Sequence, residues 1–143
     1  MALPAAAVAA EPRQRAASLL GGSISSTVAL MRRNAKFSPG YGAGGGSEQD
    51  PLLQGFRTLR RQLYTWRDWH AVAPLEYLAP FLAVVRSDET SGPITGAALA
   101  ALYAVLSAEL VQPAAPGATE AMHALVDAVT HCRFEVRRSA SQP

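Results

Sequence analysis

The stretch RSDETSGPIT at residues 86–95 holds the densest group of side chains that could do acid–base chemistry. Asp88 and Glu89 are adjacent carboxylates. Catalysis by such a pair needs a cleft, a companion base or nucleophile, and surroundings that move the two pKa values apart. The sequence shows no such companion nearby. An apolar helical stripe ends at Val85 and another begins at Ile94, so the stretch is predicted to be a turn between two helices.

The polar residues of this turn have structural reasons to be there. Pro93 suits the first position of a helix, which leaves Ser91 or Gly92 as the N-cap. Asp88 and Glu89 then precede a helix N-terminus, where negative charge is favoured by a few tenths to ~1 kcal/mol. We interpret the stretch as a helix joint without catalytic residues. A joint held by rigid helices can still be a recognition surface.

A second place for chemistry is the end of the last predicted helix, where Asp127, His131 and Cys132 lie close in sequence. A catalytic thiol needs an activating base and a group that orients the base. Adjacent residues on a helix point about 100° apart, so His131 is poorly placed to serve Cys132. His70, His123 and His131 lack metal-ligand spacing, and no second cysteine is available for zinc. We predict no metal and no catalytic residue, and keep a small Cys/His enzyme as an alternative.

Basic residues form two small groups. They are Arg57, Arg60 and Arg61, and Arg32, Arg33 and Lys36. The first three share one helical face because they stand at i, i+3 and i+4. That face is solvated, or it contacts acidic groups of a partner or lipid phosphates. A peripheral membrane module that uses these arginines is therefore a second alternative. The candidate protein-interaction residues are Arg57, Arg60, Arg61, Asp88 and Glu89.

The composition excludes several functional classes. The formal net charge is only +2, without the concentrated basic stripe that nucleic-acid binding requires. A single cysteine fits a reducing compartment. No apolar run approaches the roughly 18–20 residues that span a bilayer. The glycine-rich run GYGAGGG lacks the Gly-Lys-Ser/Thr that follows in a phosphate loop, so no cofactor is predicted.

Every convincing apolar pattern in the chain has helical spacing. Residues such as Ile24, Val28 and Met31, or Leu59 and Leu63, recur at steps of three and four, which places them on one stripe of a helix. The fourth stripe includes Val105 and Leu106, and the fifth is formed by Met122, Leu125, Val126 and Val129. The predicted helices are 18–37, 51–67, 74–86, 93–111 and 119–132.

Punctuating residues mark the breaks between these helices. Asp50 is a predicted N-cap followed by proline, and Thr119 is a predicted cap for the last helix. Pro80 is expected to kink or split the third helix. The predicted organisation is a disordered tail over 1–17, a helical domain over 18–136 with a glycine-rich linker at 38–49, and a disordered tail over 137–143. Helix pairs with short connectors favour an all-α, armadillo/HEAT-like solenoid fragment.

Four stretches together carry a family resemblance. They are RRNAKF, DPLLQGFRTLRRQL, PLEYLAPFLAVVRSDETSGPIT and ATEAMHALVDAVTHCRFE. In this order they resemble the N-terminal dimerisation and cyclophilin-binding region of the large Arf guanine-nucleotide exchange factors, most closely the Golgi GNOM/Gea subfamily. The resemblance covers residues from about 23 to 136.

The resemblance implies a non-catalytic module that helps to regulate Arf activation and vesicle-mediated transport. Catalysis in the family resides in a separate exchange domain that is absent from this chain. The implied partners are a second copy of the chain, the regulatory region of full-length exchange factors, and cyclophilin, together with a peripheral membrane contact. The implied location is the cytoplasm, at the surface of Golgi and endosomal membranes.

At the C-terminus the chain departs from the family pattern. Arg137 and Arg138 stand where an acidic connector is expected, before the chain ends. We therefore expect a C-terminally truncated fragment. If the following helices are missing, the face of Met122, Leu125, Val126 and Val129 is expected to be uncovered and to favour self-association.

Overall fold

The computed structural model describes residues 5–33 and 50–132, with side chains from residue 13 onward. Its elements are α1 (Ala5–Arg33), α2 (Pro51–Leu63), a 3₁₀ turn η3 (Trp69–Ala71), α3 (Leu75–Arg86), α4 (Gly92–Ser107) and α5 (Ala118–Thr130). None of the described residues forms a strand, so the prediction of an all-α protein is confirmed. No helix in these ranges is both long and apolar enough to cross a bilayer.

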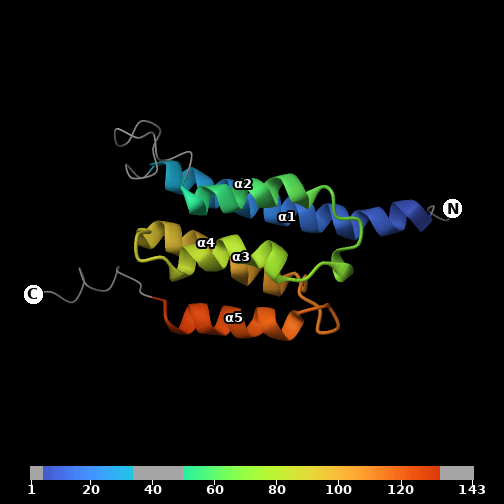
Figure 1. Cartoon of the computed structure of the whole chain (residues 1–143). Helices are drawn as coiled ribbons and strands as arrows, with labels where there is room; N and C mark the ends of the chain where they lie inside the picture. Colours follow the sequence, from blue (N-terminus) through green and yellow to red (C-terminus); the bar gives the residue numbers. More distant parts are fainter. Residues whose placement is uncertain (1–4, 34–49, 133–143) are drawn as a thin grey trace, which may run out of the picture.

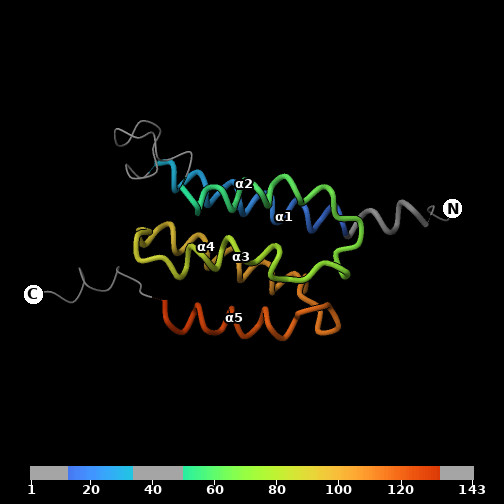
Figure 2. Tube along the Cα trace, viewed as in Figure 1, coloured from blue at the N-terminus to red at the C-terminus, as the bar shows by residue number. Residues whose placement is uncertain are grey.

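The helices stack in layers (Figure 1). α1 and α2 form the first layer, α3 and α4 the second, and α5 begins a third. α1 packs on α4 and α2 packs on α3, whereas α5 packs mainly on α3. The trace in Figure 2 shows that successive helices alternate in direction, so each helix pair is an antiparallel hairpin. Whether further layers continue this stack as a solenoid stays a prediction.

One apolar core lies between the first two layers. On α1, the buried residues recur at helical steps along its inner side, as Leu20, Ile24 and Met31 show. They meet Leu59 and Leu63 of α2, which are equally buried. Phe56 and Phe81 meet edge to face, with ring centroids 5.1 Å apart. Fully burying such side chains contributes about 1.5–3 kcal/mol each, so this seam holds the two layers together.

Helix α1 begins much earlier than expected. Its helical residues start at Ala5, inside the tail assigned to 1–17, and end at Arg33 rather than at 37. Ala16 and Ala17 are buried in the core, so at least these two residues belong to the domain. Alanine has the highest helix propensity, which explains why an Ala-rich segment without a strong apolar stripe is helical. The linker at 38–49 and the tail at 137–143 lie outside the described residues.

The helix boundaries confirm some sequence signals and correct others. Asp50 is the N-cap of α2, and its carboxylate accepts a hydrogen bond of 2.9 Å from the backbone N–H of Leu52. Pro80 does not split α3, which runs unbroken from Leu75 to Arg86. The carbonyl that loses its partner there belongs to Glu76, which is exposed, so water can satisfy it. The cap of α5 is Gly117 at a φ of 72°, not Thr119.

Candidate interaction surfaces

The stretch 86–95 is a helix joint, as its residue types predict. α3 ends at Arg86, Ser91 occupies the N-cap position of α4, and a proline follows in the first turn. The Thr90 hydroxyl fixes the turn, because it lies 3.0 Å from the Thr95 hydroxyl and 3.3 Å from the Val84 carbonyl oxygen. The cap itself makes no side-chain hydrogen bond.

The carboxylates of this joint are on the surface. Asp88 and Glu89 are both exposed, and the Glu89 backbone N–H donates to the Ser87 hydroxyl at 3.1 Å. Exposed carboxylates on a short connector have no cleft in which to bind a substrate. Their role in recognition stays a prediction.

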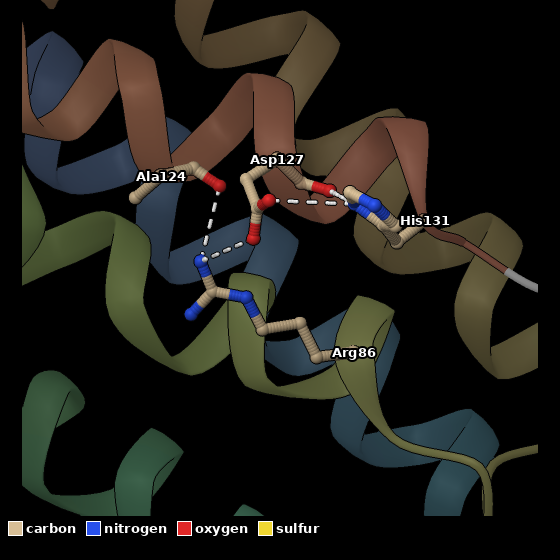
Figure 3. Close-up of polar contacts among 4 residues, drawn as sticks. All are labelled: Arg86, Ala124, Asp127 and His131. Atoms are coloured by element: carbon tan, nitrogen blue, oxygen red, sulfur yellow. Dashed lines mark hydrogen bonds and ion pairs between the residues drawn. The ribbon is translucent and has the colours of Figure 1, made fainter.

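The polar cluster at the end of α5 joins two helices (Figure 3). One guanidinium nitrogen of Arg86, on α3, donates to the Ala124 carbonyl at 3.1 Å and lies 3.9 Å from the Asp127 carboxylate. The other Asp127 oxygen lies 3.3 Å from Nδ1 of His131. These side chains are half exposed or more, so the ion pair itself contributes little. The arginine connects α5 to the second layer.

Cys132 does not join this cluster. Its side chain is half-buried and packs against the apolar core, whereas His131 is exposed. An imidazole that faces water and a thiol that faces the core do not form a nucleophile–base pair. Nowhere in the described ranges do three metal-ligating side chains converge.

Arg57, Arg60 and Arg61 lie on α2, in the first layer, and are called the arginine row below. Arg60 and Arg61 are exposed, while Arg57 is half-buried. Arg60 reaches across to α1, where its guanidinium lies 3.4 Å from the Ser25 hydroxyl. The other basic pair, Arg32 and Arg33, lies at the end of α1 in the same layer and is also exposed. The two groups therefore belong to one layer, which sequence spacing alone did not indicate.

An apolar surface forms on the side of α5 that does not contact α3. Val126 and Val129 are 57% and 46% exposed, as expected for an uncovered face. Leu125 departs from that expectation because it is buried, together with small residues of α5 that contact α3. These small residues are Ala118, Ala121 and Ala128. Sequence analysis missed this alanine stripe, although its steps of three and seven are helical.

Helix α4 adds two exposed large side chains that sequence analysis did not place on the surface. Leu106 was assigned to the buried stripe but is 36% exposed, and Tyr103 is 74% exposed. Leu106 lies one residue past Val105, which is fully buried, so the true stripe is narrower than predicted. The exposed apolar side of α5, formed by Met122, Val126 and Val129, is called the α5 face below.

Three aromatic side chains close the end of the molecule where α2 meets α3. Trp66 and Trp69 meet edge to face at 5.1 Å, and Trp69 lies 5.5 Å from Tyr77. The Tyr77 hydroxyl donates to the Leu110 carbonyl at 3.2 Å, which ties α3 to the segment after α4. Burial disfavours the phenolate and raises the pKa of Tyr77 to about 12.

In comparisons with known proteins, the chain is similar to several ARF guanine-nucleotide exchange factors. The chain is 39% identical over 127 residues to the ARF guanine-nucleotide exchange factor GNOM of Arabidopsis thaliana, an alignment that covers 88% of this chain. It is 40% identical over 127 residues to the exchange factor GNL1 of the same plant. It is 32% identical over 130 residues to ARF guanine-nucleotide exchange factor 2 of Saccharomyces cerevisiae, which covers 73% of the chain. In each case the alignment spans only 9% of the relative. No family model matches the chain.

Proposed function

The chain belongs to the family of ARF guanine-nucleotide exchange factors that includes GNOM and its yeast relatives, and from this premise we propose that it is a non-catalytic interaction module of such a factor. One observation carries the proposal: 88% of this chain aligns with only 9% of GNOM. A segment of that size, folded around its own helical core, suits a scaffold within a much longer protein.

The geometry of the ionisable groups supports a non-catalytic role. Asp88, Glu89, Asp127 and His131 are exposed, on a connector and on an outer helix. A catalytic site requires such groups to converge in a cleft that holds the substrate. The family resemblance also assigns exchange activity to a separate domain, so this chain is proposed to regulate ARF activation rather than to perform it.

We therefore expect this chain alone to leave nucleotide release from ARF unchanged. The measurement is the fluorescence of a labelled guanine nucleotide on ARF, recorded with and without the chain. A full-length exchange factor is the positive control and must accelerate release. Acceleration by the 143-residue chain would contradict the proposal.

The proposed interaction is first of all with a second copy of the chain, through the α5 face. Val126 and Val129, two of the five large apolar side chains that are most exposed among the described residues, lie there. A two-fold axis pairs the same surface of both copies, and stable interfaces of this kind bury roughly 1,200–2,000 Å². An apolar patch at the centre of such an interface is excluded from water, which supplies the driving force.

A double substitution on this face tests the dimer. We expect V126E/V129E to be monomeric in sedimentation velocity at a concentration where the unmodified chain is dimeric. Two buried carboxylates without partners would strongly oppose association. The helical circular dichroism should be kept, because both positions are exposed in the folded chain.

R60E and D88K are matched charge-changing controls on the other candidate surfaces. Both should remain dimeric. If R60E or D88K dissociates the dimer while V126E/V129E does not, the interface lies on the arginine row or the helix joint instead. If the unmodified chain is a monomer at high concentration, the dimer proposal is wrong.

Further partners are proposed on the family premise. They are the regulatory region of full-length exchange factors, cyclophilin, and the surface of Golgi or endosomal membranes. A relative in Caenorhabditis elegans, 38% identical over 87 residues, carries the name Golgi-specific brefeldin A-resistance guanine nucleotide exchange factor 1 homolog. That name supports a cytoplasmic location at Golgi membranes. The exposed arginines of the first layer, Arg32, Arg33, Arg60 and Arg61, are the candidate contact with anionic lipid.

A further inference from the structure

A groove of about 820 Å³ lies where three separate segments meet. α1 contributes Arg13, Arg15 and Leu19, the connector between α2 and α3 contributes Arg67 and Trp69, and the segment after α4 contributes Leu110. Figure 1 shows that the two connectors lie at the same end of the layers, beside α1. The lining comes from three distant parts of the sequence, so no local sequence motif predicts this groove.

The groove is positively charged overall. Three arginines line it, against two carboxylates, Asp68 and Glu109. Asp68 is occupied as the N-cap of the 3₁₀ turn η3, where its oxygen accepts from the backbone N–H of His70 at 3.0 Å. The side chains of Arg13 and Arg67 are exposed. Arginine presents a planar fork of donors that fits a carboxylate or a phosphate.

Trp69 adds a polar atom without a partner. The residue lines the groove and is only 9% exposed. Its ring is held in place by Trp66 and Tyr77. Its indole N–H is nevertheless the one buried side-chain donor of the described residues that makes no hydrogen bond. Buried donors are nearly always paired in folded proteins, so such an atom beside a groove points to a ligand acceptor.

The rim includes the C-terminal cap of α4. Glu109 has a φ of 58°, in the left-handed region that glycine usually occupies. Its N–H donates to the Leu106 carbonyl, and the N–H of Leu110 donates to the Val105 carbonyl. These two bonds are those of a Schellman cap, which explains the left-handed residue and places its glutamate side chain at the edge of the groove.

We propose that this groove binds a short peptide segment in which a carboxylate stands next to an apolar side chain. The arginine forks hold the carboxylate, and the unpaired indole N–H of Trp69 is the further donor that the proposal assigns to it. Leu19 and Leu110, which are half-buried, pack on the apolar side chain. Asp68 and Glu109 disfavour the multiply charged headgroup of a phosphorylated lipid, because like charges repel at this range.

The test uses the full 143-residue chain and a fluorescein-labelled octapeptide that has one glutamate next to one leucine and uncharged polar residues elsewhere. Binding is followed by fluorescence anisotropy at low and at high salt. We expect saturable binding that weakens as salt is added. A peptide with glutamine in place of glutamate, and another with serine in place of leucine, should each bind about tenfold more weakly, because the groove needs both features.

Variants locate the binding on the chain. R13Q and R67Q should each weaken the octapeptide by about five- to tenfold, as expected when one charge-assisted contact is removed. R61Q makes the same charge change on an exposed part of α2 and should leave affinity unchanged. W69F removes the indole N–H and should weaken binding. Circular dichroism confirms that each variant is folded.

Failure of the peptide-binding proposal can be distinguished from failure of the dimer proposal. V126E/V129E should bind the octapeptide like the unmodified chain, even when it is monomeric. Unchanged affinity in both R13Q and R67Q would overturn the proposal. So would equal binding of the glutamate and glutamine peptides. Stronger binding to vesicles that contain a phosphatidylinositol phosphate than to the peptide, lost in R13Q and R67Q, would also overturn it and assign the groove to lipid.

Discussion

Replacing Phe56 by alanine is expected to lower the free energy of unfolding by about 3–5 kcal/mol. Phe56 is 1% exposed and lies between the first two layers. Its ring meets the edge of Phe81, 5.1 Å away and inclined by 68°. The substitution removes apolar area from the core, leaves a cavity and deletes the aromatic contact. Folded domains are stable by only about 5–15 kcal/mol, so the variant should be close to unfolding.

Urea denaturation followed by circular dichroism measures this effect. Y64A is the matched control, because Tyr64 directly follows the same helix and is 74% exposed. It should change stability by no more than about 0.5 kcal/mol. A loss below about 1 kcal/mol for F56A would mean that the first two layers do not pack through this ring.

The second large effect is a loss of stability at alkaline pH that depends on Tyr77. The pKa of Tyr77 is raised from 10.0 to about 12 because the folded chain buries the hydroxyl. Below pH 10 the tyrosine is protonated in both states, so its full contribution is present. Between pH 10 and 12 the unfolded chain releases the proton and the folded chain keeps it, which favours unfolding. The expected loss is up to about 2 kcal/mol across this window.

Y77F separates this effect from the titration of other groups. At neutral pH the variant should be less stable by about 1 kcal/mol, because the Leu110 carbonyl loses its donor. Its stability should lack the step that begins at pH 10. The difference between the two proteins, from urea midpoints at each pH, should therefore fall above pH 10 and reverse its sign before pH 12. A difference that stays constant up to pH 12 would show that Tyr77 is not buried in solution.

Much of the fold follows from periodicity and capping chemistry. Ile24, Leu59 and Leu63 are buried because their steps of three and four place them on one side of a helix. Asp50 begins α2 because its carboxylate satisfies a backbone N–H that the helix leaves unpaired. Both features depend on neighbours within one helical turn, so the sequence alone contains the information.

The wrong predictions of helix bounds and burial concern residues whose environment depends on segments far away in the sequence. The start of α1 was missed because alanines carry no amphipathic signal. Leu106 was assigned to the buried stripe of its helix by its spacing, yet its side chain is 36% exposed. The alanine stripe of α5 is buried because α5 packs on α3. In each case local propensity is compatible with two environments, and tertiary packing selects one.

The candidate interaction surfaces also differ in whether the sequence alone could predict them. The joint at 86–95 could be recognised because its cap and its proline lie within a few residues of each other. The groove beside Trp69 could not, since Arg13, Arg67 and Leu110 come together only when three segments fold. An orphaned indole donor is also a property of packing, and no residue pattern reveals it.

The packing of α1 on α4 has a consequence for how the chain is made. During synthesis α1 leaves the ribosome first, but one of its two partners, α4, follows only after α2 and α3. At about 5–20 residues per second, the nascent helix waits for several seconds with part of its apolar side uncovered. The second hairpin can close at once, since its helices are joined by a short turn. Docking of α1 onto it should therefore follow the formation of the second hairpin.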